Sequence, residues 1–322
     1  MHRLPPLPVI ATLAIASACA FVAALAVGSV SVTPATLVAA LTGDAHDVAA
    51  TVVRDLRLPR AACAFAVGGL LALAGSLMQV LLRNPLADPY VLGLSGGAAC
   101  GALLAILAGA AAFVTPAAFA GACLSTLVVF GLARGRGTWS STRLLLTGVV
   151  VAAGFGALIM LILALAPDAQ VRGMLFWLIG DLAGATQGAF ALAALVIVLA
   201  LALPLARDAN LIARGDTTAA SLGVPVTTVT FALHGLAAAA TAIAVTVAGS
   251  VGFVGLVVPH AVRLVIGNDQ RYLLPACALA GGTLLVIADT LARTLVAPAQ
   301  LPVGVLTALA GVPTFLWLLR KS

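Results

Sequence analysis

Long apolar runs separated by short polar breaks make up most of the chain. A helix needs about 20 apolar residues to cross the hydrocarbon core of a bilayer. By that length the sequence predicts about ten spanning helices, at 8–30, 59–82, 90–112, 114–134, 143–166, 188–206, 227–248, 250–266, 272–296 and 302–320. Two pairs of runs, 90–112 with 114–134 and 227–248 with 250–266, are nearly continuous. If one pair formed a single long helix with a re-entrant piece, the count would fall to about nine. The pattern predicts an all-α polytopic membrane protein with a single transmembrane domain over residues 1–322.

Composition supports this assignment. The 322 residues are 63% hydrophobic and 8% charged, with a mean hydropathy of +1.21, whereas soluble domains carry about 25% charged residues. The first run, residues 8–30, is longer than the roughly 7–15 residues of a signal-peptide core. We therefore expect it to be a retained membrane span.

The basic residues predict the orientation. With ten spans both termini lie on one side, and placing them in the cytoplasm leaves few basic residues outside. Those outside are Arg54, Arg57, Arg60, Arg172 and Arg293. An excess of basic residues on the cytoplasmic side is the usual rule for membrane proteins. This excess accounts for the net charge of +6, so no nucleic-acid partner is expected.

Several classes of chemistry are excluded. Lys321 is the only lysine, and the acids are all aspartate. A phosphate-binding P-loop requires a lysine after its glycines, so any ATP used in transport is hydrolysed by another chain. The five cysteines are scattered through apolar runs without metal-ligand spacing. With no nucleophile triad or paired carboxylates either, we expect neither an enzyme nor a bound metal or cofactor.

The polar stretch 83–93 interrupts two apolar runs and contains two prolines. Pro85 and Pro89 each remove a backbone donor and fix φ, so no regular helix passes through. Asn84 and Asp88 are suited to accept the backbone donors that the break leaves unpaired. Non-helical backbone at membrane depth is tolerated only where protein or water covers it. We therefore expect a pore or contact element, the alternative being a plain turn between helices.

Small residues recur at helical spacing on one side of the run 59–82. They are Gly68, Gly69, Ala72, Gly75 and Ser76. Small residues allow helices to approach closely in lipid. The pattern predicts tight helix packing, with a substrate path between helices as the alternative.

Charged and titratable residues mark both ends of the predicted spans. Arg57, Arg60 and Arg293 fall together on the outer side, which favours an anionic partner there. Asp289 lies four residues before Arg293 on one helical face, and we expect a structural pair that orients this arginine. His260 follows a helix-breaking proline and is expected to cap freed carbonyls, with iron or haem ligation as the alternative.

The predicted cytoplasmic segment 207–226 is longer than a helical hairpin requires. Asp216, followed by two threonines, resembles the start of a capped helix. Gly223 and Pro225 are typical of a helix end. We expect two short helices across the cytoplasmic surface, where a soluble partner would meet the membrane protein.

Several of these motifs follow one another as in a known family of permeases. They are Arg57 to Arg60, the run from Gly68 through Gln79 to Asn84–Pro89, Leu92 with Gly93, Gly252 to Arg263, Leu273 to Pro275, Asp289 with Arg293, Leu301 to Gly304, and Gly311 to Phe315. Because they extend over nearly the whole chain, the sequence resembles the FecCD-type permease family. Its members are membrane subunits of ATP-binding-cassette (ABC) importers for iron-siderophore complexes, haem and cobalamin.

The resemblance implies a type II ABC importer permease fold in the bacterial inner membrane. It also implies a second permease subunit, most simply in a homodimer, two cytoplasmic ATPase subunits and a periplasmic binding protein. Three arginines match positions that receive acidic side chains of the binding protein: Arg57, Arg60 and Arg293. Four residues match the family's inner gate: Asn84, Leu86, Ser140 and Ser141. Five match its ATPase-coupling helices: Gly215, Asp216, Ala219, Leu222 and Gly223.

Two positions depart from the family pattern, and the cargo stays open. Asp216 and Gln300 stand where glutamate is usual, which leaves the ATPase interface and one outer contact less defined. The expected cargo is an iron-siderophore complex, with cobalamin or haem as alternatives. A secondary transporter driven by an ion gradient would need buried acids near the midplane, and Asp289, near a helix end, is the only candidate.

Overall fold

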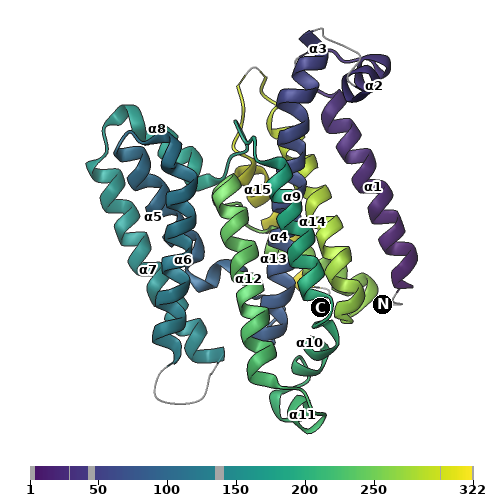
Figure 1. Ribbon diagram of the computed structural model, residues 1–322, viewed down its shortest axis with the longest axis vertical. Coiled ribbons are helices and arrows are strands. Elements are labelled where there is room, and N and C mark those ends of the chain that lie inside the picture. Colours follow the sequence, from purple (N-terminus) through teal and green to yellow (C-terminus); the bar gives the residue numbers. More distant parts are fainter. Residues whose placement is uncertain (1–3, 29, 43–47, 135–140, 298, 321–322) are drawn as a thin grey trace.

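Helix α4 (Leu58–Leu81) is the centre of the molecule. The computed structural model describes residues 4–28, 30–42, 48–134, 141–297 and 299–320. All but four of the 24 residues of α4 are buried. It is surrounded by α9 (Gly188–Ala202), α12 (Val226–Ala248), α13 (Val254–Ile266) and α14 (Gln270–Ala292) (Figure 1). Protein rather than lipid therefore surrounds α4, and α4 fixes how the neighbouring helices are placed relative to one another.

Glycines set the contacts of α4. A side-chain carbon at Gly75 would overlap the carbonyl oxygen of Gly255 on α13. Gly68 and Gly281 of α14 exclude a side chain from each other in the same way. Backbones this close are characteristic of small-residue interfaces in membranes. The prediction that the small residues of this run serve helix packing is confirmed.

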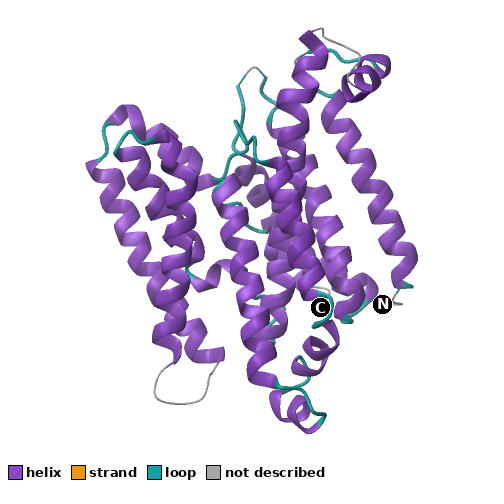
Figure 2. Ribbon diagram, viewed as in Figure 1, coloured by secondary structure: helices purple, strands orange, loops and turns teal. Residues whose placement is uncertain are grey.

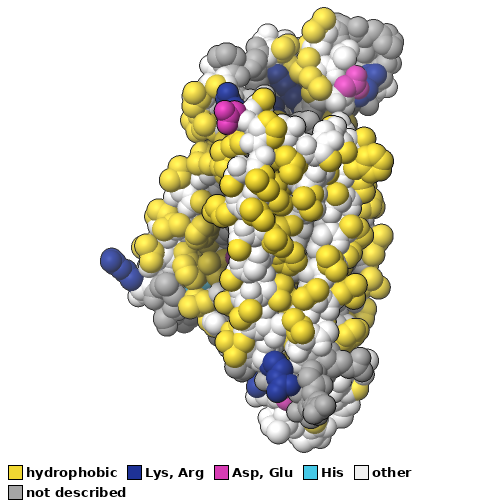
Figure 3. Space-filling model, turned by 90° about the vertical axis from the view of Figure 1, so that its left-hand side faces the viewer, with side chains coloured by type: hydrophobic (Ala, Val, Ile, Leu, Met, Phe, Trp, Pro, Cys, Tyr) yellow, Lys and Arg dark blue, Asp and Glu magenta, His cyan; other side chains and the backbone are white. Residues whose placement is uncertain are grey.

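A second group of helices stands beside the first. It consists of α5 (Leu94–Leu107), α6 (Val114–Arg134) and α7 (Ser141–Leu165), with α8 (Asp168–Ile179) at its upper end. The 3₁₀ turns η2 (Pro89–Leu92) and η3 (Ala111–Phe113) precede α5 and α6. On the side of the molecule where this second group lies, apolar side chains cover the middle of the surface, and charged side chains gather mainly toward the two ends (Figure 3). This distribution matches a face in contact with lipid.

The remaining helices complete the two ends. Helix α1 (Pro6–Ala26) packs along α14, and α15 (Val303–Leu319) against α13 and α14. Helices α2 (Pro34–Thr42) and α3 (Val48–Thr51) lie at the upper end, and a π-helical turn, η1 (Val52–Arg57), joins α3 to α4. Helices α10 (Ala206–Ile212) and α11 (Asp216–Ser221) lie at the opposite end. The segments predicted to lie on opposite sides of the membrane therefore occupy opposite ends of the molecule.

Every apolar run predicted to span is helical. Among the described residues, six helices are long and apolar enough to cross a membrane, fewer than the ten predicted spans, and a seventh span results if α9 and α10, bent by 63°, count as one. Three shorter apolar helices, α5, α13 and α15, account for the other runs. The two nearly continuous pairs are separate helices, because η3 precedes α6 and a break at Gly249–Phe253 separates α12 from α13. Throughout the described ranges the regular structure is helical (Figure 2). The protein is an all-α multi-pass membrane protein.

Candidate functional site

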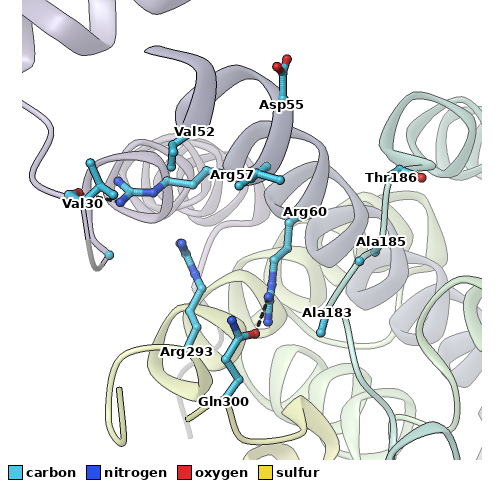
Figure 4. A pocket seen from close by; sticks show the side chains of 13 residues that line it. Val30, Val52, Asp55, Arg57, Arg60, Ala183, Ala185, Thr186, Arg293 and Gln300 are labelled. Atoms are coloured by element: carbon cyan, nitrogen blue, oxygen red, sulfur yellow. Dashed lines mark hydrogen bonds between the residues drawn. The ribbon is translucent and has the colours of Figure 1, made fainter. Parts of the chain in front are cut away.

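A cavity of about 400 Å³ opens at the upper end of the molecule, where the three arginines predicted to lie together are found. Arg57 comes from the end of η1, Arg60 from the first turn of α4, and Arg293 from the end of α14. Gln300 and the segment Ala183–Thr186 line the other walls (Figure 4). Residues far apart in the sequence thus form one cationic pocket, as their predicted topology required.

Arg57 is committed to the fold. Its side chain is 5% exposed, and it donates hydrogen bonds to the carbonyl oxygens of Leu25 at 2.8 Å, Ala26 at 3.0 Å and Val30 at 2.7 Å. The last carbonyls of a helix have no partner within it, so this guanidinium caps the end of α1. Arg57 therefore braces the wall of the pocket rather than pointing freely into it.

Arg60 holds the buried carboxylate of Asp289. Its Nε lies 3.1 and 3.0 Å from the two carboxylate oxygens, and its Nη2 lies 2.8 Å from Oδ1. Its Nη1 donates to Gln300 Oε1 at 2.8 Å, the bond drawn in Figure 4. A forked guanidinium on a carboxylate is among the strongest polar contacts in proteins, so Arg60 ties the start of α4 to the end of α14.

Arg293 is the least satisfied of the three. It donates to the carbonyl oxygen of Ala24, and its Nε lies 3.8 Å from Asp289 Oδ2. This Nε has no hydrogen-bond partner among the described residues. The expected pair of Asp289 with Arg293 is present, but the hydrogen bonds of the carboxylate go to Arg60. The guanidinium groups of Arg57, Arg60 and Arg293 outnumber the carboxylates of Asp289 and of Asp55, which also lines the cavity, so the pocket keeps a positive charge.

The polar stretch between α4 and α5 forms a closed elbow, residues 83–93. Asn84 Oδ1 accepts from the amide of Leu86 at 2.9 Å, and Asp88 Oδ1 accepts from the amide of Tyr90 at 2.8 Å. Both predicted acceptor roles are confirmed. The Tyr90 hydroxyl donates to the Val251 carbonyl at 2.9 Å, so the far end of the elbow is attached to the break between α12 and α13.

The elbow begins at Arg83, at the lower end of the molecule. Arg83 has a φ of 47°, a left-handed conformation that an arginine adopts at some cost. The amides of Arg83 and Asn84 turn back to the carbonyls of Val80 and Gln79, which closes α4 as a left-handed C-cap does. The Arg83 side chain then forms an ion pair with Asp216 of α11.

The two short helices predicted over 207–226 are present as α10 and α11. The Asn210 side chain donates to Asp269 at 2.9 Å and accepts from the amide of Gln270 at 2.9 Å, which fixes α10 to the start of α14. Hydrogen bonds from Arg271, together with that of Asn210, lower the pKa of Asp269 to about 2. The exposed carboxylate of Asp269 therefore stays charged at any physiological pH.

Helix α11 differs from its prediction at the start. Asp216 is the first helical residue and does not cap the helix, because the cap position is Gly215 with a φ of 123° and Asp216 pairs with Arg83 instead. The predicted end is confirmed, since Gly223 has a φ of 85° and its amide returns to Ala220. Ala219 is buried, whereas Leu222 is 62% exposed. The helix therefore presents an apolar side chain at the lower end.

Four other predicted site residues have different outcomes. Leu86 is exposed beside Asn84 on the elbow, but Ser140 lies outside the described residues and Ser141 is described only as the start of α7. His260 is buried, and neither ring nitrogen has a hydrogen-bond partner in the described part of the chain. Its predicted carbonyl-capping role is wrong. Among the described residues no three His, Cys, Asp or Glu side chains are grouped to hold a metal ion.

Comparisons with known proteins identify relatives over nearly the whole chain. Residues 14–321 match the FecCD transport family. The chain belongs to this family. The cobalamin import system permease protein of Halobacterium salinarum is 42% identical over 85% of this chain and 74% of its own length. The hemin transport system permease protein of Yersinia pestis is 42% identical over 83% of each chain.

A solved structure agrees with the family assignment. A metal-chelate type ABC transporter in an inward-facing conformation superposes with a TM-score of 0.88 and 28% identity, over 98% of this chain and 99% of that one. This FecCD protein is therefore an ABC importer permease. Within it, sequence reasoning missed the Arg60–Asp289 fork and the Arg83–Asp216 pair. The local sequence carries no signal for either pair, because each joins residues that only the fold brings together.

Proposed function

We propose that this permease is the pathway subunit of an importer that carries a metal chelate across the bacterial inner membrane. The observation that carries the proposal is the family match over residues 14–321, with a fold shared over 98% of the chain with a metal-chelate type transporter. The ATP is hydrolysed by two partner subunits in the cytoplasm. The whole chain, residues 1–322, acts as one transmembrane domain, with both termini in the cytoplasm and α10 and α11 at that face.

The cationic pocket at the opposite end receives the periplasmic binding protein. Its positive charge, apolar rim and open mouth suit an acidic side chain presented by a rigid partner. Arg60 and Arg293, which both line the cavity, are the contact residues. Arg57 contributes by bracing α1, which makes it a positioning residue of the docking site.

Helix α11 and its flanks seat on the ATPase. Leu222 offers an exposed apolar side chain, while Gly215 and Gly223 supply the left-handed turns that shape the segment. Ala219 packs inward and holds the helix against its neighbours. Residues 207–226 thus act as the coupling segment, and Asp216 is its link to the rest of the permease.

Two copies of the permease enclose the path between them, and the elbow forms its inner gate. Asn84 shapes the turn and Leu86 presents an exposed apolar side chain. Ser140 and Ser141, which match the family's gate positions, complete the gate. Opening requires the elbows of the two subunits to move apart, which alternating access driven by ATP binding and hydrolysis supplies.

The cargo is a large metal chelate. A ferric siderophore is the cargo expected from the sequence, and the names of two relatives add cobalamin and haem. All three are bulky and organic on the outside, so they fit a path that selects by shape and apolar contact rather than by metal ligation.

Uptake by reconstituted vesicles tests the proposal. The permease, its ATPase and its binding protein are placed in vesicles, and labelled ferric siderophore, cobalamin and haem are offered in parallel with or without ATP. Accumulation of one chelate that depends on ATP supports the proposal and identifies the cargo. Transport that ignores ATP and follows a proton or sodium gradient would replace it with the secondary-transporter alternative.

A further inference from the structure

The ion pair between Arg83 and Asp216 joins two segments that the backbone keeps far apart. Arg83 begins the elbow at the end of α4, and Asp216 opens α11, more than a hundred residues later in the chain. Both side chains are well exposed to solvent. An exposed pair contributes little to the stability of the fold, so its placement calls for a role other than holding the fold together.

Helix α11 has fewer polar contacts with the bundle than α10 has. Its packing within the described chain is mainly against α10 and α12. Its neighbour α10 is anchored differently, because Asn210 is bonded to both Asp269 and Gln270. Gln270 in turn accepts from Ser76 of α4 in the buried core. Of the two short helices, α10 is therefore tied to the buried core by hydrogen bonds, whereas α11 is tied to the elbow by an exposed ion pair.

Contacts at both ends of the elbow connect Arg83 to the neighbouring helices. Its first residue is held at a left-handed φ by the cap of α4, so the Arg83 side chain has a defined direction toward α11. At its other end, Tyr90 is bonded to Val251, and a side-chain carbon at Gly255 would come within 2.8 Å of the Pro89 ring. A displacement at Arg83 is thereby passed to α5 and to the break between α12 and α13.

We propose that the Arg83–Asp216 pair is the link through which movement of α11 reaches the elbow, and that it sets how tightly ATP hydrolysis is coupled to opening. Both are positioning residues, because neither touches the cargo. The inference rests on the proposed function, in which α11 meets the ATPase and the elbow forms the gate. Loss of the pair leaves the ATPase bound and active but disconnects it from the elbow.

The test uses the full complex of permease and ATPase in vesicles, with Leu86→Cys as a reporter on the elbow. Labelling of this thiol by a membrane-impermeant maleimide is timed without nucleotide and with ATP and vanadate. The same complex without the reporter gives the background from the native cysteines. With the pair intact, we expect trapping of the nucleotide to change the labelling rate at least about fivefold.

Three variants isolate the link. Arg83→Gln is expected to reduce that change to less than about twofold while ATP hydrolysis continues. Asp216→Asn is expected to reduce the change to the same extent, and the exchange Arg83→Asp with Asp216→Arg is expected to restore it. Arg271→Gln is the matched control, because it breaks another exposed ion pair at the same end that involves neither the elbow nor α11.

The outcomes distinguish the two proposals. A nucleotide response that persists in Arg83→Gln and Asp216→Asn overturns the link and leaves the proposed function intact. An equal loss in Arg271→Gln also overturns it, since the effect would then be general to surface charge. If the complex that carries only the Leu86→Cys reporter binds and hydrolyses ATP without any change in its labelling rate, the placement of the gate is overturned, and the link with it.

Discussion

Arg60 and Asp289 lie 229 positions apart in the chain, yet the guanidinium of one grips both carboxylate oxygens of the other. The pair joins α4 to α14 at the upper end of the bundle. It also fixes the floor of the cationic pocket. Removing one partner of a buried ion pair leaves an uncompensated charge, which makes this contact a sensitive point of the fold.

Asp289→Asn is expected to destabilise the protein by about 3–5 kcal/mol, because it leaves the guanidinium of Arg60 without its charge partner. Thermal unfolding in one detergent, followed by size-exclusion chromatography, measures the loss. Asp216→Asn, at the exposed pair with Arg83, serves as the control and is expected to shift the midpoint far less. The double variant Arg60→Leu with Asp289→Leu is expected to recover most of the midpoint. Equal shifts at Asp289 and Asp216 would contradict the role given to the buried pair.

Alanine variants of Arg57 and Arg293 are expected to affect the stability of the permease and its binding to the binding protein to different extents. Arg57→Ala removes three hydrogen bonds to carbonyls at and just after the end of α1, so it is expected to lower the unfolding midpoint more than Arg293→Ala, which removes one. Loss of Arg293 weakens binding of the binding protein by about 1–3 kcal/mol if the new contact is desolvated, roughly a 5- to 150-fold rise in Kd. Immobilised permease titrated with the binding protein gives both values. An unchanged Kd in the Arg57, Arg60 and Arg293 triple alanine variant would remove the pocket from the docking site.

Gly75→Ala is expected to cost about 1–3 kcal/mol, because the added carbon meets the backbone of Gly255 and overpacks the contact of α4 with α13. Gly235→Ala on α12 is the matched control, since no atom lies within 4 Å of its added carbon. Alanine there is expected to be neutral or stabilising by about 0.5–1 kcal/mol. Thermal midpoints of the two purified variants decide the matter, and matching values would refute the close approach.

Tyr90→Phe is expected to loosen the elbow. The lost hydrogen bond to Val251 contributes about 1 kcal/mol, so amides in 83–93 are expected to exchange with deuterium roughly fivefold faster. Tyr272→Phe, on α14, serves as the control. Mass spectrometry of both variants in detergent reports the exchange. Faster exchange confined to α14, with the elbow unchanged, is the result that argues against the attachment.

Leu222→Asp is expected to abolish co-purification of the ATPase without changing the unfolding midpoint, because the side chain is exposed and a charge there opposes an apolar contact. Leu4→Asp is the control, since this leucine is also exposed and lies outside the coupling segment. Tagged permease pulled down with its ATPase measures the association. Full recovery of the ATPase with Leu222→Asp would move the interface elsewhere.

The sequence predicts the helices well, because each apolar run must satisfy its backbone within itself once in lipid. It also predicts the acceptor roles of Asn84 and Asp88, which are local. It does not predict which side chains pair where two segments meet. The partner of Asp289 was expected four residues away in Arg293, but only the packing of α4 on α14 shows that Arg60 has the better approach.

The same limit explains the start of α11. Asp216 has the residue type and position of a cap, but the Arg83 side chain lies nearby and takes its carboxylate, which leaves Gly215 at the cap. Local propensity gives way where a tertiary partner of opposite charge is available. His260 also shows this limit, because its position beside Pro259 indicated a cap and its ring packs instead near Phe315.

The complete burial of α4 has a consequence for how the protein is made. Helix α4 enters the membrane early, but α12, α13 and α14, which cover most of it, leave the ribosome much later. At synthesis rates of about 5–20 residues per second, the interval is on the order of ten seconds. During that time the glycine-rich faces of α4 and the amide of Gln79 have no native partners. Nascent α4 is thus a candidate client for an insertase or chaperone that shelters it until the second half of the chain arrives.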